Sequence, residues 1–191
     1  LEKGKVLKDG NPEEVTDYYN ALIAEKENST IRQEKKDDGK TVTVSGTGEA
    51  VVEEIGLYNM DGQKVEFVGV GDEIILRINI CIKENLNALV LGYAIKDRLG
   101  QIIFGSNTFY EENTIYSPVR NSSYLFSIKF NANFGVGSYS IAVALTDSET
   151  HLINNYHWMD HALVFNIINL SKNIFAGITW VDQNINVEKI K

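Results

Sequence analysis

The chain has 191 residues, a formal net charge of −8, 43% hydrophobic residues and a single cysteine. This length and apolar content suit one globular domain with an appendage, and they exclude extensive disorder. The acidic balance argues against a nucleic-acid partner, and no run is apolar enough to span a membrane. The single cysteine excludes an intrachain disulfide framework. Because no signal-peptide pattern is present, we expect a cytoplasmic protein.

Residues 1–27 predict a leader in which a β-hairpin over residues 4–10 precedes a short helix. Asn11 suits a helix cap, Pro12 suits the first helical position, and Glu14 stands three residues after the cap. A helix this short has only marginal stability in isolation. Its apolar stripe must therefore pack either on the chain's own core or on an upstream domain. Because the chain starts at Leu1, we expect a fragment of a longer protein and a helix that ends an upstream domain. The stripe consists of Val15, Tyr18, Tyr19, Leu22 and Ile23.

Residues 28–41 are polar, charged and without periodicity, which predicts a linker. Residues 42–191 then form the main domain, with seven or eight short alternating runs separated by turns such as Asp61-Gly62 and 97–100. This pattern is typical of an all-β, immunoglobulin-like antiparallel β-sandwich. A last strand is expected at 174–181. The side chains expected to face the core are Ile55 and Leu57; Ile74, Leu76, Ile78, Ile80 and Ile82; Leu89, Leu91, Tyr93 and Ile95; Tyr124, Phe126, Ile128 and Phe130; Tyr139, Ile141, Val143 and Leu145; and Leu163, Phe165 and Ile167.

Two of these runs carry unusually small residues on the outward side. Gly92 and Ala94 stand in one run, and Ser140, Ala142 and Ala144 stand in the other. If the two strands pair, their shared outer face is nearly bare main chain, whereas a solvated face usually carries Lys, Glu and Thr. A ligand, a partner strand or a second subunit would cover such a face, or the face is simply exposed.

Aromatic and planar polar side chains gather in the loops and at the chain end. Aromatic rings suit the C–H faces of hexoses, and Asn, Asp or Arg groups suit their hydroxyls. Trp158 is equally well interpreted as a core residue at a strand entry. The carbohydrate-binding candidates are Asn107, Tyr110, Tyr116 and Arg120 in the long loop, Tyr156, His157 and Trp158 between two strands, and Trp180 in the last segment.

No catalytic or metal-binding pattern emerges from the sequence. His151, His157 and His161 lie close together with Asp160, but their spacing matches no zinc motif. Acidic neighbours such as Glu53-Glu54 and Glu111-Glu112 point to opposite faces of a strand, so neither couple makes a glycosidase pair. We therefore expect no metal, no cofactor and no enzyme activity.

The leader resembles the end of the ATP-binding subunits of polysaccharide ABC exporters, which close with a G-x-(three to five)-G-x-P-x-x-V-x-x-Y pattern. The remainder is similar to the extension that follows in Wzt-type subunits of bacterial O-antigen exporters. The stretches that carry the resemblance are Gly4-Lys5-Val6-Leu7-Lys8-Asp9-Gly10-Asn11-Pro12-Glu13-Glu14-Val15-Thr16-Asp17-Tyr18-Tyr19, Gly48-Glu49-Ala50-Val51-Val52, Ile95-Lys96-Asp97-Arg98-Leu99-Gly100, Ile103-Phe104-Gly105-Ser106-Asn107-Thr108, Gly137-Ser138-Tyr139 and Trp158-Met159-Asp160-His161-Ala162-Leu163-Val164-Phe165.

The resemblance implies a carbohydrate-binding domain at the cytoplasmic face of the inner membrane. Its partners would be the O-antigen polysaccharide, an upstream ATPase domain, the transmembrane exporter subunit and a second copy of the chain. It would recognise the finished glycan by its non-reducing end without catalysis, and its terminal strand would swap within a homodimer. One alternative is a structural dimerisation domain without a glycan ligand. A glycan-modifying enzyme would require a cleft with two convergent carboxylates.

Overall fold

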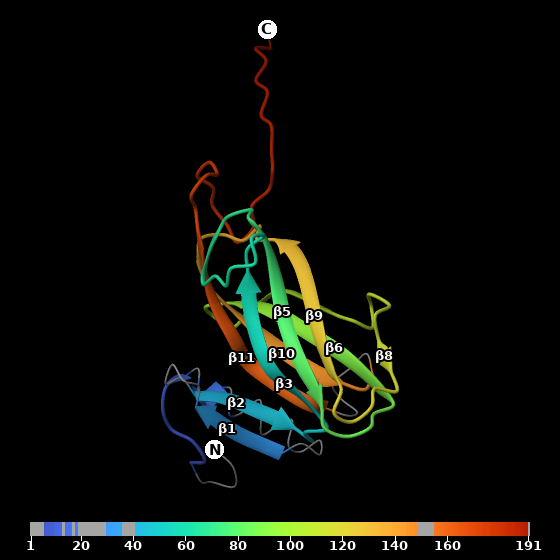
Figure 1. The fold of residues 1–191 in the computed structure, drawn as a ribbon. Coiled ribbons are helices and arrows are strands. Elements are labelled where there is room, and N and C mark those ends of the chain that lie inside the picture. The colour runs from blue at the N-terminus through green and yellow to red at the C-terminus, as the bar shows by residue number, and fades with distance from the viewer. Residues whose placement is uncertain are drawn as a thin grey trace.

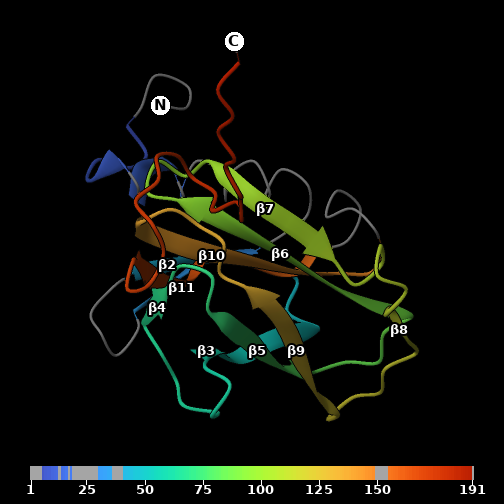
Figure 2. The ribbon, with the colours of Figure 1, turned by 90° about the horizontal axis from the view of Figure 1, so that it is seen from above.

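The computed structural model describes residues 6–12, 14–16, 18, 30–35, 41–148 and 155–190. These residues form two β-sheets packed face to face (Figure 1, and from above in Figure 2). No helix in this part of the chain is long and apolar enough to cross a membrane. The strands are β1 (Thr30–Lys35), β2 (Thr41–Gly46), β3 (Ala50–Tyr58), β4 (Phe67–Gly69), β5 (Glu73–Ile82), β6 (Ala88–Asp97), β7 (Ile102–Asn107), β8 (Ile115–Tyr116), β9 (Ser123–Asn131), β10 (Gly137–Thr146) and β11 (Asn155–Ile168).

The large sheet has the strand order β1-β2-β11-β10-β6-β7, with β4 beside β11 and β8 beside β6. The small sheet has the order β3-β5-β9. Every strand pair is antiparallel except β4–β11. The predicted all-β sandwich of antiparallel sheets is therefore confirmed, with more strands than the seven or eight expected.

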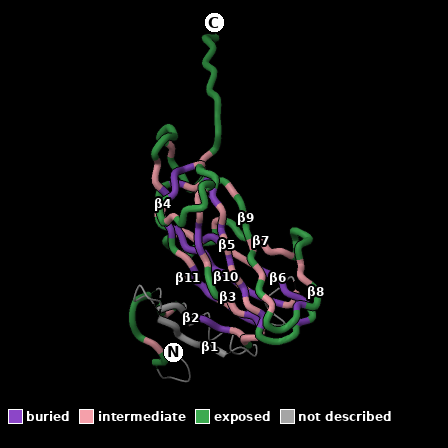
Figure 3. Tube along the Cα trace, viewed as in Figure 1, coloured by how far each residue is buried: buried purple, intermediate pink, exposed green. Residues whose placement is uncertain are grey.

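The core lies between the two sheets and follows from the period of two along each strand. On β5, Ile74, Leu76, Ile78, Ile80 and Ile82 are at most 1% exposed, while their neighbours on the other side are half-buried or exposed. Side chains on successive residues point to opposite faces, so this alternation gives the strand one buried face. Figure 3 shows that the buried residues concentrate on the strands where the two sheets face each other. The predicted inward set of β5 is confirmed.

The leader and the predicted linker both contain regular structure. Pro12, Glu14, Val15 and Tyr18 are helical, and the Val15 amide donates to the Asn11 carbonyl at 3.0 Å, as the helix start predicts. Tyr19, Leu22 and Ile23 lie outside the described residues. Residues 28–41 contain β1, which the polar sequence did not reveal, because its pairing with β2 uses main-chain groups.

The last segment corrects a prediction, because residues 174–181 are not a strand. They form only an isolated bridge between Phe134 and Thr179, with Gly177 at a positive φ of 117°. Two main-chain bonds of 3.0 Å tie this segment to residues 133–135. The chain then leaves the body of the domain as an exposed tail (Figure 1).

Candidate functional site

The outer face of the large sheet is nearly without side chains over β6 and β10. Gly92 lies opposite Ala144, and Ala94 lies opposite Ala142, in one antiparallel register. Because side chains alternate along a strand, these four residues share the face turned away from the small sheet. We call them the small-residue floor. The register confirms that the two strands pair, on which the predicted bare outer face depends.

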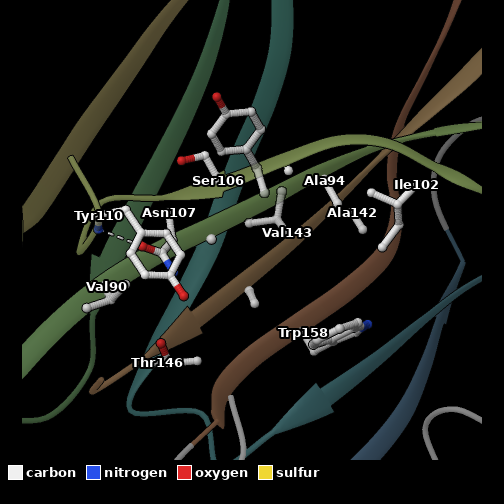
Figure 4. Close-up of a pocket in the computed structure, with 14 residues that line it drawn as sticks. Val90, Ala94, Ile102, Ser106, Asn107, Tyr110, Ala142, Val143, Thr146 and Trp158 are labelled. Atoms are coloured by element: carbon white, nitrogen blue, oxygen red, sulfur yellow. Dashed lines mark hydrogen bonds between the residues drawn. The ribbon is translucent and has the colours of Figure 1, made fainter. Parts of the chain in front are cut away.

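A pocket of about 280 Å³ lies over the small-residue floor. Tyr110 and Trp158 stand on two sides of it, and β7 supplies further lining (Figure 4). None of the described residues that line it is acidic or basic. The pocket therefore suits an uncharged ligand with apolar surface. The lining residues are Val90, Gly92, Tyr93, Ala94, Ile102, Gly105, Ser106, Asn107, Tyr110, Ala142, Val143, Ala144, Thr146 and Trp158.

Two glycines keep this pocket open. A Cβ atom built on Gly92 would meet the Cβ atoms of Ala144 and Asn107, both at 3.8 Å, which is ordinary contact. A Cβ atom built on Gly105 would lie 3.3 Å from the carbonyl oxygen of Tyr93. The fold thus tolerates a first carbon at Gly92, but any larger side chain there would occupy the pocket.

Trp158 is placed by the strands on both sides of it. It lies on β11 opposite Ala144 of β10 and opposite Ser45 of β2. Directly opposed residues share a face, so its indole stands on the same outer side as the small-residue floor. Trp158 therefore lines the pocket and is not part of the core between the sheets.

Tyr110 is held over the pocket by a bonded turn. Its amide donates to Asn107 Oδ1 at 2.9 Å (Figure 4). Its ring meets Phe109 edge-on with centroids 6.1 Å apart. The same turn is tied to β6, because the Leu91 amide donates to Thr108 Oγ1 at 3.0 Å. Tyr110 is 65% exposed, so the turn presents an accessible ring in a defined place.

Tyr116 and Arg120 lie outside the pocket. Tyr116 is 73% exposed on β8 and faces Ala88 of β6, which shares its side of the strand with Val90 and Gly92. Tyr116 thus extends the pocket's face along β6. Arg120 is exposed, with Nη1 4.0 Å from Glu84 Oε1.

Tyr156 and His157 are buried away from the pocket. The Tyr156 hydroxyl donates to the Ala88 carbonyl at 3.3 Å, and burial, with Asp147 and Glu49 nearby, raises the pKa of this phenol to about 12. His157 Nδ1 accepts the Val52 amide at 2.9 Å, which joins β11 of the large sheet to β3 of the small one. Burial lowers the pKa of the His157 imidazole to about 4, so His157 is neutral at physiological pH.

Trp180 lies at the other end of β10. Its amide donates to Asn133 just before β10 begins, whereas the pocket residues Ala144 and Thr146 are at the end of that ten-residue strand. The strand spans roughly 30 Å. The Trp180 ring packs edge-on against Phe175 with centroids 5.2 Å apart, and it contacts the core cluster. This geometry suits a side chain that covers one end of the core between the two sheets.

Asp160, Glu53 and Glu54, which the sequence offered as metal or catalytic groups, are engaged in ion pairs. Asp160 pairs with Lys96, both nearly buried, and His161 Nδ1 lies 4.0 Å from Asp160 Oδ2. Within the described chain, from which His151 is missing, no group of three or more acidic, His or Cys side chains is placed to hold a metal. Glu53 and Glu54 pair with Lys83 at 3.6 Å and Lys64 at 3.9 Å respectively.

Sequence reasoning found three pocket residues, Asn107, Tyr110 and Trp158, besides the small-residue floor. It missed Thr146 and Val90, although alternation along the two strands extends the outer face to both. It also missed Ile102, an edge residue that joins the pocket through the pairing of β6 with β7. No local signal distinguishes that residue from any other exposed isoleucine.

The fold defines the chain as a β-sandwich domain with a ligand-sized pocket on one outer sheet face. A solved structure described as the crystal structure of the C-terminal domain of wzt superposes with a TM-score of 0.67 at 13% identity, covering 82% of this chain and 93% of that chain. A β-glucosidase from Listeria innocua in complex with glucose reaches a TM-score of only 0.35 at 7% identity, covering 68% of this chain and 16% of that one. Such a weak likeness carries no argument. Among curated proteins, none matches the chain.

Residues 41–181 match the family described as the Wzt C-terminal domain. The match covers well over half of the chain, so the chain belongs to the Wzt C-terminal domain family. This family is a non-catalytic accessory domain of the ATP-binding subunit of O-antigen ABC exporters. The resemblance stated from the sequence is thereby confirmed.

Proposed function

We propose that this domain binds the O-antigen polysaccharide of its exporter in the pocket over the small-residue floor, and so couples the finished glycan to export. The observation that carries the proposal is a pocket between two aromatic rings, Tyr110 and Trp158, over nearly bare main chain. Aromatic faces bind the C–H faces of sugars, and Asn107 adds an amide to the lining. The described lining holds no acidic or basic side chain, so the proposed role is binding without catalysis.

The size of the pocket favours recognition of a chain end. Its volume of about 280 Å³ is at the lower limit of the roughly 300–1,000 Å³ typical of sites for drug-sized ligands. One sugar ring fits such a space better than several consecutive rings do. We therefore propose that the non-reducing end enters the pocket, while Tyr116 on the same face supports the next unit.

Saturation-transfer NMR with the O-polysaccharide of the source bacterium tests this proposal. Signal from the intact chain, and none after its non-reducing end is trimmed, is the expected result. Equal signal from both would replace end recognition with recognition of internal repeats. No signal from either at millimolar sugar would exclude glycan binding by this domain.

The exposed tail supports a second candidate function, a dimerisation domain for the exporter ATPase. Ile185, Val187 and Ile190 are 75%, 89% and 91% exposed in a segment that makes no strand here. An extended segment that carries such exposed apolar residues gains stability by pairing with an exposed edge such as β7, where Phe104 is 49% exposed. A swapped terminal strand in a homodimer would have this form. Sedimentation of the chain with and without residues 182–191 tests it, because loss of a dimer on truncation is expected.

Both proposals place the domain beside other parts of the exporter. The partners would be an upstream ATPase domain, joined through the leader helix, and the transmembrane exporter subunit at the cytoplasmic face of the inner membrane. Copurification of the ATP-binding subunit with the membrane subunit, compared with and without this domain, measures how much the domain contributes to the assembly.

A further inference from the structure

We infer that Thr108 is a positioning residue, whose hydroxyl fixes the turn that presents the Tyr110 ring to the pocket. Thr108 does not line the pocket itself. It follows β7 directly and ends one of the stretches that carry the family resemblance, residues 103–108. The inference rests on the proposed function and names a residue that acts on the same site through Tyr110.

Two hydrogen bonds join Thr108 to Leu91 of β6. The Thr108 amide donates to the Leu91 carbonyl at 2.9 Å, and Thr108 Oγ1 accepts the Leu91 amide at 3.0 Å. In an antiparallel ladder, two residues of a hydrogen-bonded pair exchange both main-chain bonds, so the second acceptor is normally a carbonyl. Here the hydroxyl takes the place of the Thr108 carbonyl. This replacement ends the ladder between β6 and β7.

The carbonyl that the hydroxyl releases closes the turn. The Thr108 carbonyl accepts the Asn113 amide at 2.7 Å. Tyr110 lies inside the loop closed by this bond, and its own amide donates to Asn107 Oδ1 at 2.9 Å. The position of Tyr110 therefore depends on which acceptor of Thr108 the Leu91 amide uses.

The turn also holds one residue in a backbone conformation that side chains rarely adopt. Glu112 has a positive φ of 56°. Such a conformation persists where surrounding bonds determine it. The Glu112 amide donates to the Phe109 carbonyl at 3.1 Å, and Asn113 Nδ2 donates to the Glu111 carbonyl at 2.8 Å. These bonds define one shape for a turn whose aromatic ring is exposed.

The anchor of the turn lies in the core. Leu91 is 0% exposed, and its strand β6 lies between β10 and β7 in the large sheet. A buried amide without an acceptor is costly. If the hydroxyl of residue 108 is removed, we therefore expect the carbonyl of the same residue to rotate back to the Leu91 amide. The Asn113 amide then loses its acceptor, and the turn that carries Tyr110 opens.

Amide hydrogen exchange on the full chain tests the turn without a ligand. Thr108→Val removes the hydroxyl from a side chain of similar shape, and Thr108→Ser retains the hydroxyl. We expect the Asn113 amide to exchange about tenfold faster in the valine variant and to be unchanged in the serine variant. The amides of β5, in the core, should exchange equally in all three chains, which shows that the domain has not loosened as a whole.

Titration with the O-polysaccharide of the source bacterium connects the turn to the site. Thr108→Val should bind about tenfold more weakly, whereas Thr108→Ser should stay within about twofold of the unaltered chain. The matched control is Ser122→Ala, which removes a hydroxyl bonded to the Val119 carbonyl at 2.6 Å in another exposed turn and should leave binding unchanged. In a chain that already carries Tyr110→Ala, Thr108→Val should have no further effect on affinity, because Thr108 acts through that ring.

The outcomes separate this inference from the proposed function. Normal binding by Thr108→Val, or losses from Thr108→Val and Tyr110→Ala that multiply, would overturn the inference alone. Weaker binding accompanied by faster exchange throughout β5 would also overturn it, since Thr108 would then act on the whole fold. If the unaltered chain binds no polysaccharide, the proposed function falls, and unchanged Asn113 exchange in the valine variant would still refute the role of Thr108 in the turn.

Discussion

The two outer faces of the sandwich differ sharply in what they expose. The outer face of the small sheet carries long charged side chains: Arg77 lies over the Tyr58 ring at 4.6 Å, and Lys129 pairs with Glu73 at 2.8 Å. The outer face of the large sheet carries the small-residue floor and a pocket. Both sheets bury their inner faces in the same core.

This difference shows how one fold separates stability from recognition. A charged face is solvated and discourages association, so the small sheet needs no cover. A face of Gly and Ala leaves main chain and methyl groups accessible, and in this domain two aromatic rings flank it. The same fold thus gives one face that is inert and one that is ready for a ligand. Substitutions matched between the two faces test this contrast.

The largest effect is expected from the buried ion pair on the large sheet. Asp160→Ala leaves the Lys96 ammonium nearly buried without its partner, which should destabilise the domain by roughly 3–5 kcal/mol. Denaturant unfolding at pH 7 measures the loss. The double variant Asp160→Ala with Lys96→Met is the control, since it removes both charges and should recover much of the stability. A loss below 1 kcal/mol for the single variant would mean that water reaches Lys96.

A pH-dependent loss of stability of about 3 kcal/mol is expected from His157. Its pKa is about 4 in the folded chain and 6.5 ordinarily, so the unfolded state binds the proton first. Stability is therefore fully present above pH 6.5 and falls as the pH drops towards 4.

The control for this pH effect is His157→Gln, which keeps an oxygen acceptor for the Val52 amide but cannot titrate. Unfolding curves of both chains between pH 7 and 4 isolate the His157 contribution from that of the carboxylates. Parallel curves for the two chains would show that His157 is hydrated in the folded state.

Filling the pocket should weaken glycan binding about a hundredfold or more. Gly92→Leu places a side chain on the floor, where an added Cβ has room but the rest of leucine occupies the space for a ligand. Ser127→Leu adds the same group to the exposed outer side of the small sheet and should bind as the unaltered chain does. If both variants bind normally, the ligand lies elsewhere.

Each tryptophan substitution should cost about 2 kcal/mol, but of different quantities. Trp158→Ala should weaken the free energy of glycan binding, and Trp180→Ala should lower the free energy of unfolding. Trp158→Ala removes one side of the pocket and should weaken glycan binding about thirtyfold, with little change in melting temperature. Trp180→Ala should leave binding unchanged and destabilise the domain, because its ring packs on Phe175 and the core. Titration and thermal unfolding of both variants give the comparison. A large fall in the stability of the Trp158 variant would instead assign Trp158 a structural role.

The sequence predicts the sandwich and the small-residue floor because both depend on local alternation. The run from Ile74 to Ile82 fixes its own buried face, and the small residues on β6 and β10 need only the pairing of two strands. Tyr110 and Trp158 were found because aromatic rings suit sugar faces, but the same reasoning also selected Tyr116, Tyr156 and Trp180, which lie outside the pocket.

The rest depends on contacts that no local pattern encodes. Tyr156 and His157 look like binding residues in the sequence, but the structure buries both side chains. Tyr156 bonds to Ala88 of the same sheet, and His157 bonds to Val52 of the opposite sheet. β1 is polar except for Ile31, and it forms a strand through main-chain pairing with β2. Residues 174–181 were expected to form a terminal strand, yet within the described chain they make only one bridge, to Phe134.

The smallest effect is expected from the exposed ion pair on the small sheet, which completes the contrast with Asp160. Lys129 and Glu73 are 52% and 43% exposed, so water and salt screen their attraction even at 2.8 Å. Lys129→Ala should therefore change the free energy of unfolding by less than about 1 kcal/mol and leave glycan binding unaltered. Unfolding at low and high salt checks the reason, because the small difference should vanish at high salt. A salt-independent loss as large as that of Asp160→Ala would show that burial does not separate the two faces, and it would remove the argument for an inert small sheet.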